Sequence, residues 1–257
     1  MLNRVILYPW TMACILIYNA KTMPEFLLCL HGWGGSSESF TELREALKGT
    51  LIEIVSPDLP GFGKEPEPAS PWSVDDYAEW IENNEPIANC QLPIAILGHS
   101  HGGRIAIKIA ARGNLQINHL YLCAAAGISR PRNALRLTAG MAAKAGNNLL
   151  SLPVLKNLKK PARSLLYKIL RAHDYETASP MMRQTMAKVI QEEIRPLLGN
   201  ISIPTDIFWG EDDKVTPVSD AHIIHDEIKG SSLHIYPGVK HKVHRDKARE
   251  IAEIIQN

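Results

Sequence analysis

Cysteine is scarce in this chain, and the few that are present form no metal-binding pattern. Only 4 of the 257 residues are cysteine, and no two of them make a C-x-x-C pair, so the sequence contains no zinc motif. Cys29 and Cys123 lie within short apolar runs, where a thiol behaves as a small hydrophobic side chain. This usage is typical of reduced thiols, and we expect a cytoplasmic protein.

A long hydrophobic run is also missing. The apolar stretch at 5–18 has 14 residues and is interrupted by Pro9, whereas a membrane-spanning helix needs about 18 or more. A signal peptide is conceivable because a basic residue precedes the stretch, but Tyr18 stands where cleavage requires a small residue. We therefore predict two opening strands, at 3–8 and 12–18, and no transmembrane segment.

An excess of charge of either sign is absent from the chain as a whole. Lysine and arginine number 28 and aspartate and glutamate 27, a net charge of +1, which argues against a nucleic-acid-binding protein. The balance is uneven along the chain. Residues 127–200 hold 13 basic and 4 acidic side chains, a net charge of +9, so the remainder carries −8.

What the sequence does contain is a regular alternation of short apolar runs and amphipathic stretches. The predicted strands are 26–30, 51–55, 94–97, 119–123, 205–209 and 233–236. Helices of ten or so residues separate most of them, and Ser39 with Glu42 and Ser73 with Asp76 are predicted to cap two of these helices. Such spacing favours a mostly parallel sheet, because parallel strands need a crossover connection.

Residues 127–200 interrupt the alternation with helical patterns and no convincing strand. The predicted helices there are 131–146, 160–172 and 179–195. Because the alternation resumes at 205, we predict one α/β core formed by 1–126 and 201–257, with 127–200 inserted into it as a helical lid.

One motif carries chemistry. Gly98-His99-Ser100-His101-Gly102 matches G-x-S-x-G and lies directly between a predicted strand and a predicted helix. A serine in so tight a turn has a strained backbone, which flanking glycines permit because side chains there would clash. The turn lifts the hydroxyl off the sheet and aims the first N–H groups of the helix at the place where negative charge develops. Ser100 is therefore a candidate nucleophile.

Four further segments stand in register with this motif. All five are His31-Gly32-Trp33-Gly34-Gly35, Asp58-Leu59-Pro60-Gly61-Phe62-Gly63, Gly98-His99-Ser100-His101-Gly102-Gly103, Trp209-Gly210-Glu211-Asp212-Asp213 and Pro237-Gly238-Val239-Lys240-His241. With them the chain resembles the α/β-hydrolase superfamily over nearly its whole length. The resemblance implies an eight-stranded, mostly parallel sheet with a helical cap inserted after the sixth strand, which is where the basic segment falls.

The resemblance also implies a catalytic triad. Ser100 is the nucleophile, and His241 is the base that takes its proton and returns it to the leaving group. His244 fits the second, non-catalytic histidine of relatives with a G-H-x-x-H pattern. Asp213 is the expected acid that orients the imidazole, and Asp212 is the rival for that place.

The same resemblance assigns the oxyanion donors to the backbone N–H groups of Trp33 and His101. The Trp33 side chain either lines the acyl pocket or packs in the core, and the residues leave both open. His31 is expected to be structural. The chemistry requires no metal and no organic cofactor.

These features predict a serine hydrolase acting on carboxylic esters. Alternatives on the same fold are a lysophospholipase or monoacylglycerol lipase, a thioesterase, and a carbon–carbon bond hydrolase, which Lys242 disfavours because such relatives carry tryptophan after the catalytic histidine. A non-catalytic ligand-binding protein is the alternative of a different class. The basic segment 127–200 is either a solvated helical surface or a docking face for an acidic acyl carrier protein or an anionic lipid surface.

Overall fold

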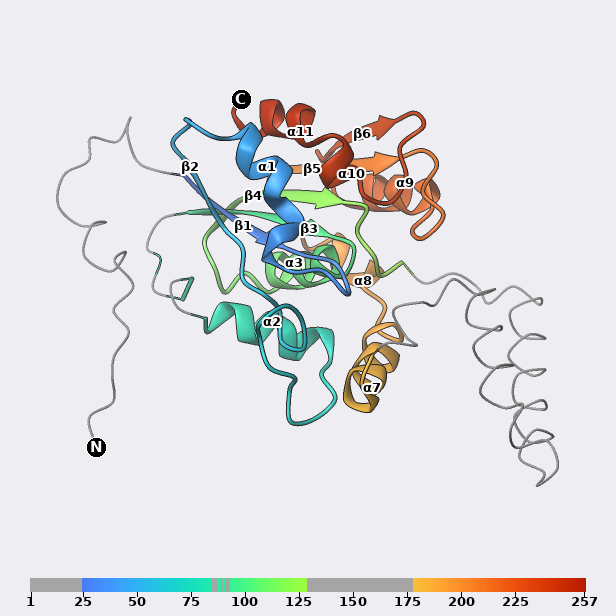
Figure 1. The fold of residues 1–257 in the computed structure, drawn as a ribbon. Helices are drawn as coiled ribbons and strands as arrows, with labels where there is room; N and C mark the ends of the chain where they lie inside the picture. Colours follow the sequence, from blue (N-terminus) through green and yellow to red (C-terminus); the bar gives the residue numbers. More distant parts are fainter. Residues whose placement is uncertain (1–24, 85–86, 89, 91–92, 129–177) are drawn as a thin grey trace, which may run out of the picture.

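The computed structural model describes residues 25–84, 87–88, 90, 93–128 and 178–257. Within them lies a six-stranded parallel sheet in the order β2-β1-β3-β4-β5-β6 (Figure 1). The strands are β1 (Glu25–Leu30), β2 (Ile52–Val55), β3 (Ile94–His99), β4 (Ile117–Cys123), β5 (Thr205–Gly210) and β6 (Ser232–Tyr236). All six predicted strands are thus confirmed, and the two predicted at 3–8 and 12–18 lie outside the described residues.

Helices cover both faces of this sheet. They are the 3₁₀ helix η1 (Ser37–Phe40), α1 (Thr41–Ala46), α2 (Val74–Glu82), α3 (His101–Arg112), α7 (Pro180–Val189), α8 (Arg195–Leu198), α9 (Val218–Glu227), α10 (Val243–Asp246) and α11 (Ala248–Ile255). Crossovers between parallel strands are right-handed. The connection from β1 to β2 runs opposite to the later ones, so α1 lies on one face, with α10 and α11 packed beside it, and α2, α3 and α9 lie on the other (Figure 1).

The reversal of strand order creates a topological switch point. β1 and β3 are hydrogen-bonded neighbours, with Leu28 opposite Ile96 and Leu30 opposite Gly98, but the chain leaves them toward opposite faces. In open α/β sheets, ligands bind in the crevice at the carboxyl ends of the strands beside such a point. The loops after β1 and β3 carry the first and third of the five motifs, so the topology places a site there.

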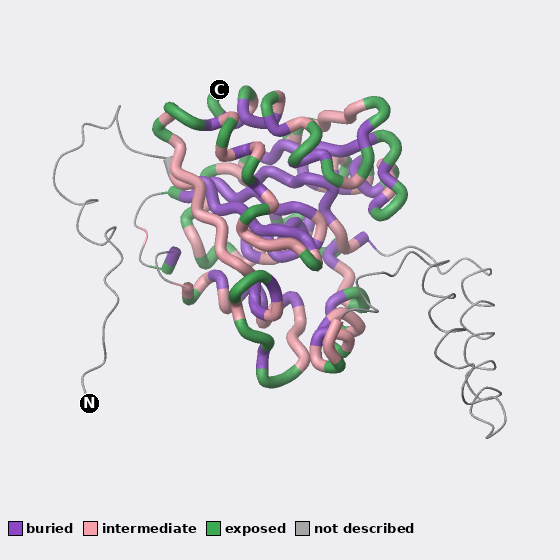
Figure 2. Tube along the Cα trace, in the orientation of Figure 1, coloured by how far each residue is buried: buried purple, intermediate pink, exposed green. Residues whose placement is uncertain are grey.

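The centre of the sheet is dry. Every residue of β3 is buried, and so is every residue of β5 (Figure 2). Burial on both faces explains why these strands are nearly continuous apolar runs and show no polar alternation. Such strands form a rigid base for the loops at their carboxyl ends.

One of the two predicted helix caps is confirmed. Ser73 and Asp76 form a capping box at the start of α2, with each side chain accepting the other's backbone N–H. The predicted cap at Ser39 is wrong. Ser36 begins the 3₁₀ turn η1, and Ser39 closes its capping box from the third position, so α1 begins one turn later without a side-chain cap.

Only part of the predicted insertion at 127–200 lies within the described residues. The helices predicted at 131–146 and 160–172 lie outside the described residues. The third, predicted at 179–195, is two helices, α7 and α8, separated by a turn. Among the described residues, no helix has the length and apolar character needed to span a membrane.

Candidate active site

Ser100 lies in a strained turn between β3 and α3. Its backbone has φ 52° and ψ −110°, a conformation that side chains with a Cβ rarely adopt. Glycines make the turn possible: a Cβ on Gly98 would lie 2.6 Å from the carbonyl oxygen of Gly102, and one on Gly102 would collide with the carbonyl of Leu30. The turn is therefore pressed against the end of β1.

Two backbone donors border this turn. His101 begins α3, so its N–H lacks an acceptor within the helix, and the N–H of Trp33 donates to no acceptor among the described residues. Gly34 has φ 71° and lets the loop after β1 turn back tightly. A Cβ on Gly32 would lie 3.2 Å from the Cβ of Ser100, so this loop closely approaches the nucleophile.

His31 holds the same loop in place. Its Nδ1 donates to the carbonyl oxygen of Gly32 at 2.8 Å, and its Nε2 accepts the N–H of Leu59 at 2.9 Å. This pair of bonds defines a neutral imidazole, and burial lowers the pKa of His31 accordingly. The expected structural role of His31 agrees with this geometry, which ties the loop after β1 to the loop after β2.

The side chains of Trp33 and His101 pack on each other. Their ring centroids are 5.4 Å apart, and the Trp33 ring also meets Phe62 edge-on at 4.9 Å. Trp33 is half-buried and His101 is buried. Neither ring nitrogen of His101 has a hydrogen-bond partner in the described part of the chain, and burial lowers its pKa well below the usual value.

Asp213 and His241 meet at the carboxyl edge of the sheet, after β5 and β6. Nδ1 of His241 and Oδ2 of Asp213 are 2.7 Å apart. The Asp213 carboxylate is fully buried and also accepts the N–H groups of Val215 and Thr216 and the Thr216 hydroxyl, at 2.7, 3.1 and 2.8 Å. Burial raises the pKa of Asp213, but the His241 bond and these donors outweigh it, so the pKa lies below its usual value and the group is ionised.

The neighbouring Asp212 has a different environment. Its side chain is exposed, and its carboxylate has no hydrogen-bond partner among the residues described. Its backbone N–H donates to the carbonyl of Val239 at 2.9 Å. Of the two candidate acids, Asp213 is the one that contacts His241.

The loop that carries His241 is bonded to the residue that precedes Ser100. His99, the residue before Ser100, makes a 3.1 Å hydrogen bond to the carbonyl oxygen of His241, and the two rings are 4.9 Å apart. Within the described residues no hydrogen bond joins the Ser100 hydroxyl to His241, whose Nε2 is left free by the Asp213 bond. Catalytic hydrogen bonds in unliganded sites are often long and tighten when substrate binds.

His244 occupies a separate, buried position. Its ring lies 3.8 Å from that of His99 and 5.5 Å from that of Phe40, measured between centroids. Burial, with help from Arg245, lowers the pKa of His244 to about 3. Among the described residues, no hydrogen bond or ion pair joins His244 to Asp213 or Asp212, and its non-catalytic role stays a prediction.

Two residues of the site were not predicted from the sequence. Thr216 bonds Asp213 and lies 3.3 Å from Nδ1 of His241, and its only signal is that it follows Asp213 by three residues, the reach of a turn. His99 lies inside the serine motif, but its partner is 142 residues away. No local pattern identifies a contact of that range.

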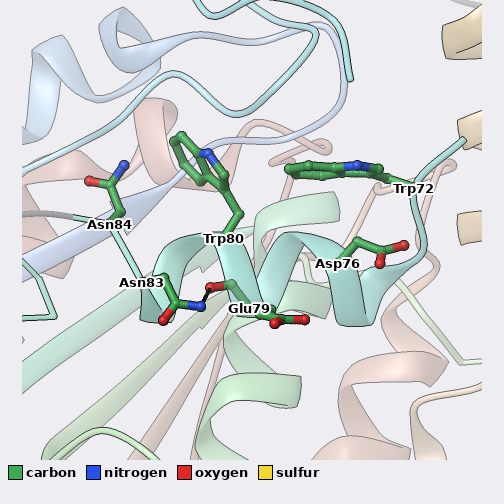
Figure 3. Close-up of a pocket in the computed structure, with 6 residues that line it drawn as sticks. All are labelled: Trp72, Asp76, Glu79, Trp80, Asn83 and Asn84. Carbon is green, nitrogen blue, oxygen red and sulfur yellow. Dashed lines mark hydrogen bonds between the residues drawn. The ribbon is translucent and has the colours of Figure 1, made fainter. Parts of the chain in front are cut away.

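The described residues show no arrangement of three or more His, Cys, Asp or Glu side chains that could hold a metal. A surface groove of about 440 Å³ lies along α2 (Figure 3), and no residue of the candidate triad lines it. It is lined by Trp72, Asp76, Glu79, Trp80, Asn83 and Asn84. None of these is one of the residues to which the chemistry above was assigned.

Comparison with known families shows which protein family the chain belongs to. The sequence profile described as serine aminopeptidase, S33, matches residues 23–248, which is most of the chain. The chain belongs to this family of α/β hydrolases. The predicted superfamily and its hydrolase class are thereby confirmed, with six of the eight expected strands in the described residues.

Several proteins are similar to this α/β hydrolase along most of their length. A pimeloyl-(acyl-carrier protein) methyl ester esterase of Neisseria meningitidis is 26% identical over 253 residues, covering 92% of this chain and 95% of that one. An uncharacterized protein of Mycobacterium bovis is 27% identical, covering 88% and 72%. Among solved structures, an esterase of Exiguobacterium antarcticum has a TM-score of 0.67 at 21% identity, covering 91% of each chain.

Proposed function

We propose that this α/β hydrolase cleaves carboxylic esters through a covalent acyl-enzyme, with Ser100, His241 and Asp213 as its triad. The observation that carries the proposal is the 2.7 Å hydrogen bond between His241 and the ionised Asp213. It lies at the same edge of the sheet as the strained Ser100. A serine hydroxyl is unreactive at neutral pH and needs a base of this kind, itself oriented by an acid.

In the first half-reaction, the Ser100 oxygen attacks the ester carbonyl carbon while Nε2 of His241 accepts the hydroxyl proton. The carbonyl oxygen becomes negatively charged and accepts hydrogen bonds from the N–H groups of Trp33 and His101. When the intermediate collapses, the bond from carbon to the alcohol oxygen breaks. His241 gives its proton to that oxygen, the alcohol leaves, and Ser100 remains acylated.

In the second half-reaction, water takes the place of the alcohol. His241 accepts a proton from the water as its oxygen attacks the acyl carbon, and the same two N–H groups stabilise the oxyanion. The bond to Ser100 then breaks, the serine oxygen regains the proton from His241, and the carboxylic acid leaves. Asp213 stays ionised throughout and stabilises the imidazolium that forms in each half-reaction.

A fluorophosphonate probe tests this proposal directly, because it forms a stable bond only with an activated serine. We expect stoichiometric labelling of the protein at Ser100, found by peptide mass spectrometry, and none in Ser100→Ala. Hydrolysis of p-nitrophenyl esters of increasing chain length would then measure the depth of the acyl site. An unlabelled, correctly folded wild type would contradict the proposal and favour a non-catalytic ligand-binding protein.

An ester carried by an acyl carrier protein is the substrate class that two observations favour. A relative similar over 92% of this chain is a pimeloyl-(acyl-carrier protein) methyl ester esterase. Residues 127–200, which we propose form a helical cap, carry a net charge of +9, and carrier proteins of this kind are acidic partners that such a segment would attract.

The substrate class is tested with one acyl methyl ester presented in two ways, attached to the carrier protein and free. We expect kcat/KM for the carrier-bound ester to be at least about 10-fold higher, a gain of about 1.4 kcal/mol in transition-state binding. Equal values would reject carrier recognition. Preference for a thioester, a lysophospholipid, a monoacylglycerol or a carbon–carbon bond in the same panel would replace it with one of those activities.

A further inference from the structure

His99 is a buried imidazole that the proposed reaction does not use, although it lies next to the nucleophile in the sequence. Only 7% of the residue is exposed. Its Nε2 is 3.1 Å from the carbonyl oxygen of His241, and its ring centroid is 4.9 Å from that of His241 and 3.8 Å from that of His244. A buried side chain thus joins the serine turn directly to the histidine loop.

The same ring borders the loop that carries the Trp33 donor. A Cβ on Gly32 would lie 2.8 Å from Nδ1 of His99, so the backbone of that loop lies against the ring with no room for a side chain between them. His99 therefore contacts the loop after β1 and the loop after β6, while it is itself the last residue of β3. Its ring thus connects three segments that are far apart in the sequence.

The hydrogen bond defines the protonation state of His99. A carbonyl oxygen only accepts, so Nε2 must carry the hydrogen. Burial lowers the pKa of His99 well below its usual value, and the nearby imidazoles of His244 and His241 lower it further. His99 is accordingly a neutral donor and carries no charge that would compete with the imidazolium of His241.

The backbone around His241 has a second anchor on its other side. The carbonyl of Val239 accepts the N–H of Asp212 at 2.9 Å. The carbonyls of Val239 and Lys240 also pack against Gly210, in the space that a Cβ on that residue would fill. One anchor comes from the strand that bears the acid, and the other, His99, comes from the strand that bears the nucleophile. Of the two anchors, only His99 relates the position of His241 to that of Ser100.

We propose that His99 is a positioning residue for the reaction described above. By donating from Nε2 to the carbonyl of His241, it fixes the backbone from which the catalytic imidazole reaches Ser100. This inference depends on the proposed ester hydrolysis, and it concerns the rate of proton transfer and not the binding of substrate. A displacement of about 1 Å between reacting groups costs about 100-fold in rate.

Two substitutions separate the donor from the ring. His99→Phe keeps a buried aromatic ring against His244 but removes the donor, whereas His99→Gln supplies an N–H at nearly the position of Nε2. We expect His99→Phe to lower kcat, and the rate of fluorophosphonate labelling of Ser100, by about 10- to 100-fold, with KM changed less than about 3-fold. His99→Gln should recover most of both rates.

His225 provides the matched control. It is a half-buried histidine on α9, bonded at Nδ1 to the Ser231 hydroxyl at 2.9 Å, and His225→Phe and His225→Gln should leave both rates unchanged. Full activity in His99→Phe would overturn the proposal, and so would equal losses in His99→Phe and His99→Gln. Thermal unfolding of each variant shows whether it is folded before its rates are compared.

A measurement on the wild type needs no variant to fold. Two-bond ¹⁵N–¹H NMR correlation of the histidine rings identifies the tautomer of each one, and we expect hydrogen on Nε2 of His99 at neutral pH. Hydrogen on Nδ1 would overturn the proposal. Absence of labelling in the wild type would contradict ester hydrolysis itself, whereas a labelled wild type with a fully active His99→Phe would contradict only the role of His99.

Discussion

Burial divides the histidines of the site into two kinds. His31, His99 and His244 are buried, and burial is the largest cause that lowers the pKa of each. His241 is the one with a carboxylate partner, Asp213, at 2.7 Å. Neutral neighbours are what a catalytic imidazole requires, because a second positive charge within 5 Å would oppose the formation of imidazolium.

Asp213→Asn tests the acid at the scale of a single atom. The amide nearly preserves shape and burial but removes the charge that stabilises imidazolium and favours the wrong imidazole tautomer, so we expect kcat to fall by about 10³–10⁴-fold. Asp212→Asn is the matched control, since its side chain is exposed, and it should retain activity within about 2-fold. Equal losses in both variants, measured on a p-nitrophenyl ester, would reject the assignment of Asp213.

His244 makes the stability of the protein depend on pH. Its folded-state pKa of about 3 lies below the ordinary value of 6.5. Between pH 3 and pH 6.5, the imidazole is therefore protonated in the unfolded chain and neutral in the folded chain. Its effect is absent above pH 6.5 and destabilises the protein as the pH falls toward 3. His244→Phe should therefore lose about 2 kcal/mol less than the wild type between pH 7 and pH 5, measured by urea unfolding.

The turn after β3 shows how elements constrain a residue. Gly98 and Gly102 were predicted from the serine motif because a strand that turns directly into a helix brings its own backbone too close for side chains. The helix start at Ser36 could not be predicted in the same way. Ser39–Glu42 matches the usual S-x-x-E capping pattern, whereas Ser36–Ser39 has serine in place of the acid, and the 3₁₀ turn that nevertheless begins at Ser36 depends on packing.

Gly102→Ala tests the packing of this turn against β1. Because its Cβ would collide with the carbonyl of Leu30, we expect a loss of about 1–3 kcal/mol or more in unfolding free energy, together with a lower labelling rate at Ser100. Gly199→Ala is the control: a Cβ there meets nothing within 4 Å, and its φ of −66° suits alanine. A Gly102→Ala protein as stable as Gly199→Ala would disprove the close contact.

Three strands are joined by one carboxylate. Asp206 on β5 lies 2.8 Å from Nε2 of His119 on β4 and 2.7 Å from Nε2 of His234 on β6. Burial raises the pKa of Asp206, but these two bonds outweigh it and the pKa lies below the usual 3.8. The ionised form thus stabilises the sheet above about pH 4, and this contribution is lost as the pH falls through the folded-state pKa.

Asp206→Asn should consequently destabilise the protein by about 1–3 kcal/mol at pH 6. The difference from the wild type should shrink at pH 3, below the ordinary pKa of 3.8, because the unfolded wild-type chain then binds a proton at this carboxyl that the folded chain binds less readily. Chemical unfolding of both proteins at the two pH values measures it. A difference that is constant with pH would show that Asp206 contributes through packing alone.

At the scale of the molecule, the order of the motifs predicted the sheet but not the contacts across it. Five motifs in register gave the strand succession and the loops that bear Ser100, Asp213 and His241, because parallel strands place their carboxyl ends at one edge. The roles of Thr216 and His99 depend on which side chains that edge brings into contact. Contacts between residues far apart in the chain are products of the folded arrangement and leave no local pattern.

The uneven charge of the chain leads to a prediction about association. If the basic segment 127–200 recruits an acidic carrier protein, salt should weaken that step, because screening shortens the Debye length from about 10 Å at 0.1 M to about 3 Å at 1 M. We expect KM for a carrier-bound ester to rise at least several-fold over this range while KM for the free ester stays constant. A salt-independent KM for both would exclude electrostatic docking.

The hydrogen-bonded pairing of β1 with β3 has a consequence for engineering. The N–H groups of Trp33 and His101, which we propose as oxyanion donors, follow two adjacent strands whose separation is set by the ladder between them, at about 4.8 Å. The segment between β4 and β5 belongs to neither of these two strands. In a chimaera, this segment is replaced by the corresponding segment of another hydrolase. The chimaera should therefore acquire the substrate range of that hydrolase, while the reacting atoms keep their spacing.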